Sequence, residues 1–382
     1  MKVGYFTNIA PHYREKLWRL LIDDSQIDVE FYFDKNDKGS IEKIDFKSKF
    51  WSKGKLGKLN HNENIKIKWP KKVVIWQKGI LRISINKNYD AVIFLGDMYI
   101  LSTWLSALLF RIRGKRVIFW SHGFYGNESF LKGKLRSLFK SLAHQHLLYG
   151  HRAKNIMAKK GFDHTRLNVI YNSLDYDKHF NIRRKLKEYD SPSKITFFED
   201  NKKPLLIFVG RLTPEKKIDL LINAIQEINK SKIKYNILLI GDGREIQKLK
   251  TLADDGLGKY IHFLGACYDD EVIGKYLYFA DLCVSPGNVG LTAIHSLTFG
   301  TPVLTHNNFS NQMPEFESIK EDLTGCFFEE NNSHHLAIKI EQWFEKSRDR
   351  NEIREECFKV VDDYYNPYKQ LNILKEVLNT NL

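Results

Sequence analysis

Two cations five positions apart, Arg211 and Lys216, follow a short apolar run at residues 204–209 that is predicted to be a buried strand. The residues after them show the apolar spacing of an amphipathic helix: Leu220, Leu221, Ala224, Ile225 and Ile228. Arginine offers phosphate oxygens a planar fork, and lysine offers a point charge. Cations between a strand and the next helix stand where open α/β sheets bind ligands. The spacing therefore predicts a diphosphate site; the alternative is a surface ion pair with Glu215 or Asp219.

A second anion-binding signal is Gly290-Leu291-Thr292, just before a predicted helix from about Ala293. A glycine at this point lets backbone N–H groups approach an anion, and the helix dipole adds partial positive charge. The plainer interpretation is a loop in which Thr292 caps the helix. Gly210, at the end of the 204–209 strand, and Asp242, within Gly241-Asp242-Gly243, belong to neighbouring strand exits and are predicted to line the same site.

Gly210-Arg211-Leu212 with Glu215-Lys216 and the following helix resembles the donor-domain signature of the GT4 family of retaining glycosyltransferases. Further segments match in the same order: 237–243, 261–265, 280–292, 300–305 and 324–328. In the first half the resemblance is looser and rests on 11–14, 121–123 and 169–175. The resemblance implies the GT-B fold, in which two Rossmann-like parallel-sheet domains face a central cleft, and it implies phosphate contacts for Arg211 and Lys216.

Length and pattern agree with two α/β domains. A chain of 382 residues exceeds what a single core usually holds, and strands alternate with helices throughout. We expect an acceptor- and membrane-facing domain at 1–180 and a nucleotide-sugar domain at 200–365. The segment 366–382 is expected to be a helix that crosses back to the first domain, as the resemblance implies.

The chain departs from the family at two positions. GT4 enzymes usually carry two glutamates eight positions apart, and the register set by Gly290 places Gly287 and His295 there. The resemblance implies that His295 replaces the residue that binds ribose and that Asn288 is a candidate for the sugar contact. A histidine packed in the core is the alternative for His295. Glu315 or Glu317 is a candidate source of a carboxylate from another loop.

Four residues are candidates in the first domain. His122 follows a predicted strand at 116–120, and the resemblance implies a place near the donor sugar, although a lone histidine is often structural. His12 and Arg14 open the first helix and are candidates for contact with the acceptor or its phosphate. Asp97 ends another strand; it either acts on the acceptor hydroxyl or caps the next helix.

Charge is divided unevenly along the chain. Residues 1–200 hold 38 Lys and Arg against 20 Asp and Glu, whereas the remainder is slightly acidic. A helix predicted over 131–148 combines four cations with an apolar face formed by Leu131, Leu135, Leu138 and Leu142. Such a helix can lie on an anionic bilayer, where each cation contributes about 1 kcal/mol. The alternative is a solvated helix packed into its own domain.

These observations predict a metal-independent, retaining hexosyltransferase without a cofactor. The expected donor is a UDP-sugar, with a GDP-sugar second, and the expected acceptor is a glycan, lipid-linked as in bacterial surface polysaccharide or lipopolysaccharide assembly. We expect a cytoplasmic protein at the inner face of the membrane, because the N-terminus shows no signal peptide and the longest apolar stretch, 98–110, is too short to span. The alternatives are a catalytically silent scaffold of the same fold and, less favoured, a nucleic-acid-binding protein, for which no binding module is recognisable.

Overall fold

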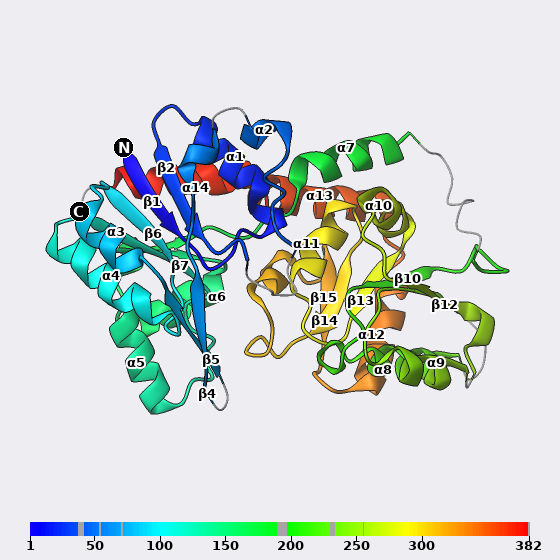
Figure 1. Cartoon of the computed structure of the whole chain (residues 1–382). Coiled ribbons are helices and arrows are strands. Elements are labelled where there is room, and N and C mark those ends of the chain that lie inside the picture. The colour runs from blue at the N-terminus through cyan, green and yellow to red at the C-terminus, as the bar shows by residue number, and fades with distance from the viewer. Residues whose placement is uncertain are drawn as a thin grey trace. The chain divides into compact units, whose positions relative to one another are not determined.

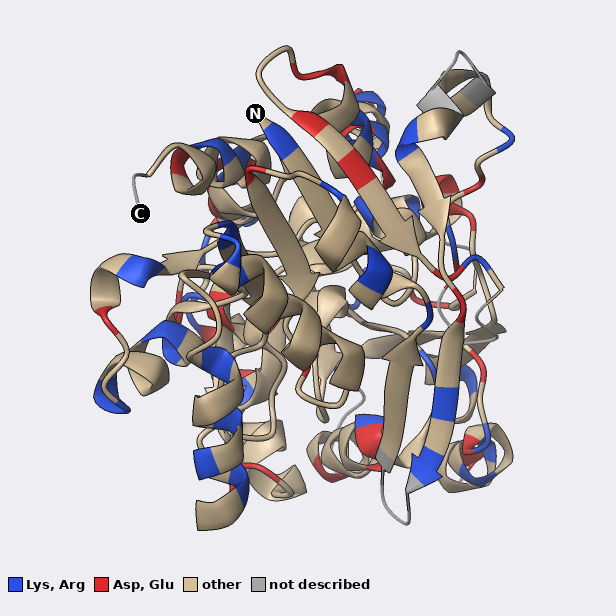
Figure 2. Ribbon diagram, turned by 60° about the vertical axis from the view of Figure 1, so that its left-hand side comes forward, with Lys and Arg blue, Asp and Glu red and all other residues tan. Residues whose placement is uncertain are grey.

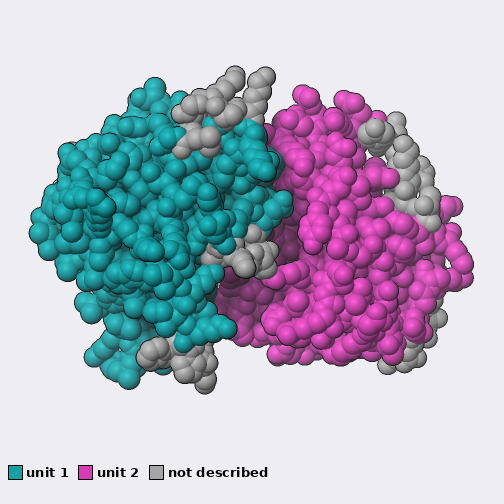
Figure 3. All heavy atoms as spheres, viewed as in Figure 1, with its two compact units in different colours: residues 1–175, 367–382 teal, residues 176–366 magenta. Residues whose placement is uncertain are grey.

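A computed structural model describes residues 1–36, 42–52, 55–69, 72–188, 197–229, 234–254 and 256–380. The chain forms two compact units, residues 1–175 with 367–382 and residues 176–366 (Figure 3). Each unit contains one parallel sheet with helices on both faces (Figure 1). The predicted α/β class with two Rossmann-like sheets is therefore confirmed.

The sheet of the first unit has seven parallel strands in the order β3-β2-β1-β6-β7-β8-β9. The strands are β1 (Lys2–Phe6), β2 (Asp28–Phe33), β3 (Leu59–His61), β6 (Ala91–Leu95), β7 (Arg116–Ser121), β8 (Gln145–Leu148) and β9 (Leu167–Val169). An antiparallel hairpin, β4 (Asn64–Trp69) and β5 (Lys72–Gln77), stands apart from this sheet. The helices are α1 (Glu15–Asp23), α2 (Lys49–Ser52), α3 (Ile80–Asn86), α4 (Leu101–Ile112), α5 (Phe130–Lys140), α6 (His151–Lys159) and α14 (Pro367–Asn379).

Strand β1 shows how the first sheet builds two apolar layers. Successive side chains of a strand point to opposite faces. Val3 and Tyr5 join the layer that contains Trp18 of α1, whereas Phe6 joins the opposite layer. Helix α14 belongs to the first of these layers through Leu374, Val377 and Leu378, so the C-terminal helix is part of the core of the first unit.

The sheet of the second unit has six parallel strands in the order β12-β11-β10-β13-β14-β15. The strands are β10 (Leu205–Val209), β11 (Asn236–Ile240), β12 (Ile261–Gly265), β13 (Leu282–Ser285), β14 (Val303–His306) and β15 (Gly325–Phe328). The helices are α7 (Tyr176–Leu186), α8 (Ile218–Ile228), α9 (Ile246–Asp254), α10 (Asp270–Phe279), α11 (Leu291–Thr298), α12 (Ser333–Glu345) and α13 (Arg350–Tyr364). Strand β10 is buried along Leu205–Phe208, as its unbroken apolar run predicts.

The prediction of a single helix over 131–148 is wrong at its C-terminal end. Helix α5 ends at Lys140, and residues 145–148 form β8, which pairs with β7 and β9 inside the sheet. Its burial pattern also differs from that of a helix packed through its leucines. Arg136 and Lys140 are buried, whereas Leu131, Leu135 and Leu138 are 79%, 50% and 61% exposed.

Candidate functional site

The strand order of each sheet reverses at one point, and the loops that follow the strands there are the natural ligand-binding loops of an open α/β sheet. In the first sheet the reversal lies between β1 and β6, and in the second it lies between β10 and β13. The predicted site residues follow these strands or their neighbours. They form two groups, one in each unit.

In the second unit, the loops after β10 and β13 are joined at Lys216. The Lys216 ammonium donates to the Asn288 carbonyl at 2.5 Å, and the Gly287 N–H donates to the Lys216 carbonyl at 3.0 Å. Burial, with the neighbouring Arg211 as a second cause, lowers the pKa of Lys216. Arg211 itself is exposed. A partly buried lysine beside an exposed arginine forms a cationic loop that an anionic ligand would stabilise.

Gly287 occupies a position that leaves no room for a side chain. A Cβ atom there would stand 2.1 Å from the Glu215 carbonyl oxygen and 2.8 Å from the backbone of Lys216. The glutamate that the GT4 register would place here cannot enter without moving the Lys216 loop. Glycine at this position therefore lets the backbone at 287 pack directly against the backbone of Glu215 and Lys216.

The start of α11 is held from two sides. Gly290 precedes the helix with φ of 52°, and the Thr292 hydroxyl donates to the Val209 carbonyl at the end of β10. Gln312, which the sequence did not single out, accepts from the Val289 N–H at 2.9 Å. The Gln312 amide also donates to the Thr305 hydroxyl at 2.9 Å, so it braces the 287–290 loop. A lone glutamine in a loop carries no sequence signal for this role.

The exits of β10 and β11 are packed backbone to backbone. The Gly210 N–H donates to Ile240, and the Leu212 N–H donates to the Asp242 carbonyl. A Cβ at Gly241 would stand 1.8 Å from the Gly210 oxygen, so this contact requires glycine. Asp242 is exposed, and its carboxylate accepts from the Gly243 N–H at 2.6 Å. Asp242 thus lies at the same edge of the sheet as Arg211 and Lys216.

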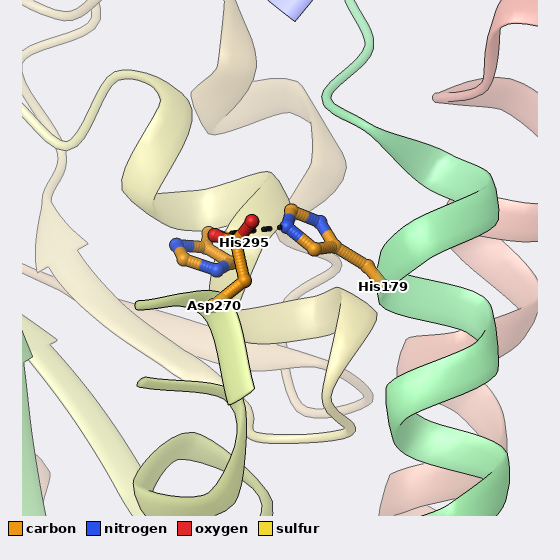
Figure 4. A group of neighbouring side chains, drawn as sticks. All are labelled: His179, Asp270 and His295. Carbon is orange, nitrogen blue, oxygen red and sulfur yellow. Dashed lines mark ion pairs between the residues drawn. The ribbon is translucent and has the colours of Figure 1, made fainter. Parts of the chain in front are cut away.

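His295 packs on another histidine (Figure 4). Its ring is stacked on His179 of α7, with ring centres 5.0 Å apart and planes at 18°. Its Nε2 is buried and has no hydrogen-bond partner among the described residues, and burial, followed by the charge of His179, lowers its pKa to about 3. The imidazole is therefore neutral at physiological pH.

Asp270 of α10 completes this cluster. Its Oδ1 lies 3.3 Å from His179 Nε2, and its Oδ2 lies 2.6 Å from the Lys178 ammonium. Within the described ranges, His179, Asp270 and His295 are the group whose potential metal-ligand atoms all lie within 4.8 Å of one another. Because Lys178 and His179 already pair with the carboxylate, an ion-pair network accounts for this arrangement.

Glu315, the alternative carboxylate, is buried in the short helix at Pro314–Ser318. Its charge opposes the lowering of the Lys216 pKa, so it lies in the electrostatic environment of Lys216. A carboxylate is therefore present near the lysine even though position 287 holds glycine.

The first unit contains a cavity of about 470 Å³. The loops after β1, β6 and β7 form its walls, and Lys132, Arg136 and Lys140 line it from α5. Arg14, Asp97 and His122 also line it, so three of the four first-domain candidates lie around one cavity. His12 is outside this lining; its ring Nδ1 lies 3.2 Å from the Glu42 carbonyl.

His122 is half-buried in the cavity wall between cations. Its ring lies 4.6 Å from that of Tyr149, and its Nδ1 has no partner among the described atoms. Burial, followed by the charges of Lys140, Arg14 and Arg136, lowers its pKa to about 4. His122 is therefore neutral at physiological pH and available as a hydrogen-bonding group. Asp97 accepts from the Tyr99 N–H at 3.0 Å, which is the geometry of a local turn.

An apolar surface covers the outer sides of α4 and α5. The two helices pack through Trp104 and Phe139, whose rings are 4.8 Å apart. The exposed members of this α4–α5 surface are Leu101, Leu105, Leu108, Ile112, Phe130, Leu131, Leu135 and Leu138. Lysine and arginine residues are spaced along α5 (Figure 2). In the part of the chain that is described, no helix is long and apolar enough to cross a membrane.

Among the comparisons with known proteins, the family match falls within the second unit. Residues 193–360 match the family model described as "Glycosyl transferases group 1". A glycogen synthase from Hydrogenovibrio crunogenus is 25% identical over 259 residues, which cover 57% of this chain and 51% of that protein. An uncharacterised glycosyltransferase, MJ1178, from Methanocaldococcus jannaschii is 25% identical over 154 residues, 40% of this chain and 41% of that protein. The chain thus spans about half the length of these relatives or less.

Solved structures match the whole chain. Anabaena Alr3699/HepE in complex with UDP has a TM-score of 0.68 at 14% identity, covering 99% of both chains. The lipopolysaccharide outer core galactosyltransferase WaaB in its apo form has a TM-score of 0.68 at 16% identity, covering 98% of this chain and 99% of that one. The chain therefore has the GT-B fold of these structures, and its second unit carries the match to the glycosyl transferases group 1 family model.

Proposed function

We propose that the protein is a retaining glycosyltransferase that uses a nucleotide-sugar donor. The observation that supports this most directly is the junction of Lys216, Gly287 and Asn288 at the switch point of the second sheet. There two cations and the start of α11 lie at one sheet edge, within the segment that matches the glycosyl transferases group 1 family.

The donor is proposed to be a UDP-sugar, with a GDP-sugar second. The structural neighbour from Anabaena was solved with UDP, which favours uridine as the base. Arg211 and Lys216 would bind the two phosphates, together with backbone N–H groups at Gly290, Leu291 and Thr292. His295 and Asn288 remain our candidates for the ribose and sugar ends of the donor, and Gly210 and Asp242 would line the same pocket.

The chemistry proposed for these residues is stabilisation of the leaving group. As the bond to the anomeric carbon breaks, negative charge builds on the diphosphate, and preorganised cations lower the energy of that state. We propose that Arg211 and Lys216 do this without a metal ion. Retention of configuration means that the acceptor hydroxyl attacks from the face that the diphosphate leaves. His122, neutral at physiological pH, is the candidate group of the first unit beside the sugar, and Asp97 is the candidate for the acceptor hydroxyl.

The acceptor is proposed to be a lipid-linked glycan at an anionic membrane surface, in surface polysaccharide biosynthesis. The support is the α4–α5 surface, in which exposed leucine, isoleucine and phenylalanine side chains lie on the same side of α5 as the exposed Lys134. Large exposed apolar patches mark interaction sites, and basic side chains beside them suit anionic lipids.

The test is a transfer assay with a panel of UDP- and GDP-sugars and a short-chain lipid diphosphate-linked sugar as acceptor. We expect one nucleotide-sugar to yield product with retained anomeric configuration, and equal rates with and without EDTA. Product from no donor would contradict the proposal and favour a silent GT-B scaffold, for which Gly287 and the core packing of His295 would then be the reason. Loss of activity in EDTA, restored by a divalent ion, would refute metal independence alone.

A further inference from the structure

The cavity of the first unit holds more buried positive charge than its own carboxylates neutralise. Arg14 and Lys140 both line it and are 7% and 2% exposed. Neither forms an ion pair with a carboxylate among the described residues. Arg14 donates instead to the hydroxyls of Tyr5 and Tyr149, and Lys140 donates to the Gly96 carbonyl at 2.8 Å and to the Ser121 hydroxyl.

A third buried cation in the cavity wall, Arg136, does have a carboxylate partner, in contrast to Arg14 and Lys140. It pairs with Glu128 at 2.7 Å, as buried charges normally do. Among the described residues that line the cavity, Asp97 is the one carboxylate, and its Oδ1 already accepts a backbone N–H. Buried charges are normally paired because desolvation costs several kcal/mol per ion. Arg14 and Lys140 face one cavity without carboxylate partners, so the cost of burying their charges is offset only if a ligand supplies negative charge there.

Other groups around the cavity also suit an anion. Arg14 Nε and His122 Nδ1 are buried and have no partner within the described part of the chain. Lys132 adds a further cation to the lining from the first turn of α5. Donors therefore come from the loop after β1, the loop after β7 and one face of α5.

We propose that this cavity is an oxyanion subsite, in which Lys140 and Arg14 bind a phosphate or carboxylate group of the acceptor. The identification of the ligand as the acceptor rests on the proposed glycosyltransfer; the oxyanion chemistry does not. Helix α5 would then have two roles, since its buried face supplies Lys132, Arg136 and Lys140 to the cavity and its opposite face carries Leu131, Leu135 and Leu138.

The electrostatic surroundings of Lys140 suit an anion. Burial, followed by the charge of Arg136, lowers its pKa to about 7. Asp97 after β6, His122 after β7 and His146 on β8 also interact electrostatically with Lys140, and Arg14 and Lys132 line the same cavity. Asp97 raises the pKa but does not offset burial. Binding an anion should therefore draw a proton onto Lys140 at pH 7 to 8.

The test is calorimetric titration of the full chain with two probes, inorganic pyrophosphate and glucuronate. The background is the Arg211→Ala variant, so that binding at the proposed donor loop does not contribute. For a diphosphate-linked acceptor we expect pyrophosphate to bind and glucuronate to bind at least tenfold more weakly; for an acidic-sugar acceptor we expect the reverse. In either case affinity should fall as pH rises from 6 to 9, and binding at pH 7.5 should take up protons.

Variants on α5 decide whether the cavity is responsible. Lys140→Met should weaken binding of the preferred probe at least tenfold, whereas Lys134→Met, on the exposed side of the same helix, should leave it unchanged. If Lys140→Met is poorly folded, Lys140→Gln removes the charge and keeps a donor for the Gly96 carbonyl. No binding of either probe, or equal binding by wild type and a folded Lys140 variant, would overturn the inference.

These outcomes are separable from failure of the proposed function. Nucleoside diphosphate binding by the wild type with no Lys140-dependent probe binding would overturn the subsite alone. Lys140-dependent probe binding in a chain that binds no nucleotide would support the subsite and contradict the glycosyltransferase.

Discussion

Lys140 and Leu138 stand two residues apart on α5, yet Lys140 is 2% exposed and Leu138 is 61% exposed. Helices usually bury their leucines and expose their lysines. In α5 this arrangement is inverted: Arg136 and Lys140 are buried and the leucines are exposed. Its charged face is directed to a cavity of its own unit, and its leucine face is exposed. Both the proposed membrane contact and the proposed oxyanion subsite depend on this inversion.

The leucine face should be required for membrane binding. A fully buried leucine side chain contributes about 1.5–3 kcal/mol relative to an exposed one, and about 1.4 kcal/mol is a factor of ten in affinity. The double change Leu131→Glu with Leu138→Glu should therefore reduce binding at least tenfold to vesicles containing anionic lipid. Vesicle sedimentation measures this.

The control is Leu323→Glu in the second unit, where the leucine is also exposed, at 45%. That variant should bind vesicles like the wild type. Equal loss in both variants, or no loss in the double variant, would remove the α4–α5 surface from the proposal.

Burial of Lys140 should make stability depend on pH in a defined direction. Its pKa falls from 10.5 in the unfolded chain to about 7 in the folded one, so the unfolded state binds more protons between these values. The contribution of this group to stability therefore rises as pH increases from 7 to 10.5, and its destabilising effect is complete below pH 7. Thermal unfolding of Lys140→Met against wild type should show a difference that shifts in favour of wild type over this range.

The total change should be on the order of a few kcal/mol. Lys134→Met, whose lysine is exposed, should show no such pH dependence relative to wild type. Parallel pH curves for wild type and Lys140→Met would show that Lys140 remains charged in the fold.

Much of the architecture follows from local sequence, but the inversion of α5 does not. Apolar runs such as 205–209 identify buried parallel strands, and Gly290 and Gly300 flank α11. Periodicity identifies the leucine face of α5 without saying whether that face is inside. Burial of Lys140 depends on the Gly96 carbonyl and Ser121, which are distant in sequence, so no local pattern reports it.

Other features of the site also depend on tertiary contacts. The apolar run at 145–148 has only four residues and continues the apolar spacing of the preceding helix. Sequence pattern alone therefore does not identify it as β8, a strand inside the sheet. The family resemblance predicts a glutamate at the position of Gly287, but the contact of Gly287 with the Lys216 loop arises only when β10 and β13 lie side by side. The link from Gln312 to Val289 likewise joins segments 23 residues apart.

Gly287 should be intolerant even of alanine. The added Cβ would overlap the Glu215 carbonyl oxygen, and overpacking of this kind typically costs about 1–3 kcal/mol. Gly287→Ala should lower the melting temperature and weaken nucleotide binding by displacing Lys216. Gly133→Ala is the matched control, because a Cβ there meets no atom closer than the Lys160 ammonium at 4.0 Å. Unchanged nucleotide affinity in a folded Gly287→Ala variant would contradict a role of this loop in binding the donor.

Arg211 should be needed for transfer but not for folding. It is exposed, so Arg211→Ala removes charge from the proposed diphosphate site without opening a cavity. We expect at least a hundredfold loss of turnover with an unchanged melting temperature, in line with the loss typical for one electrostatic group at a reacting centre. Arg244→Ala is the control, since Arg244 is exposed and pairs with Glu215 at the surface. Near-normal turnover in Arg211→Ala would refute its phosphate role.

The most direct test of the central claim is calorimetric binding of UDP, GDP, ADP and CMP to the wild-type chain, each with and without EDTA. We predict that one nucleoside diphosphate, UDP first, binds with an affinity that EDTA does not change and that Arg211→Ala abolishes. Binding of none of the four nucleotides would contradict a nucleotide-sugar donor site in the second unit.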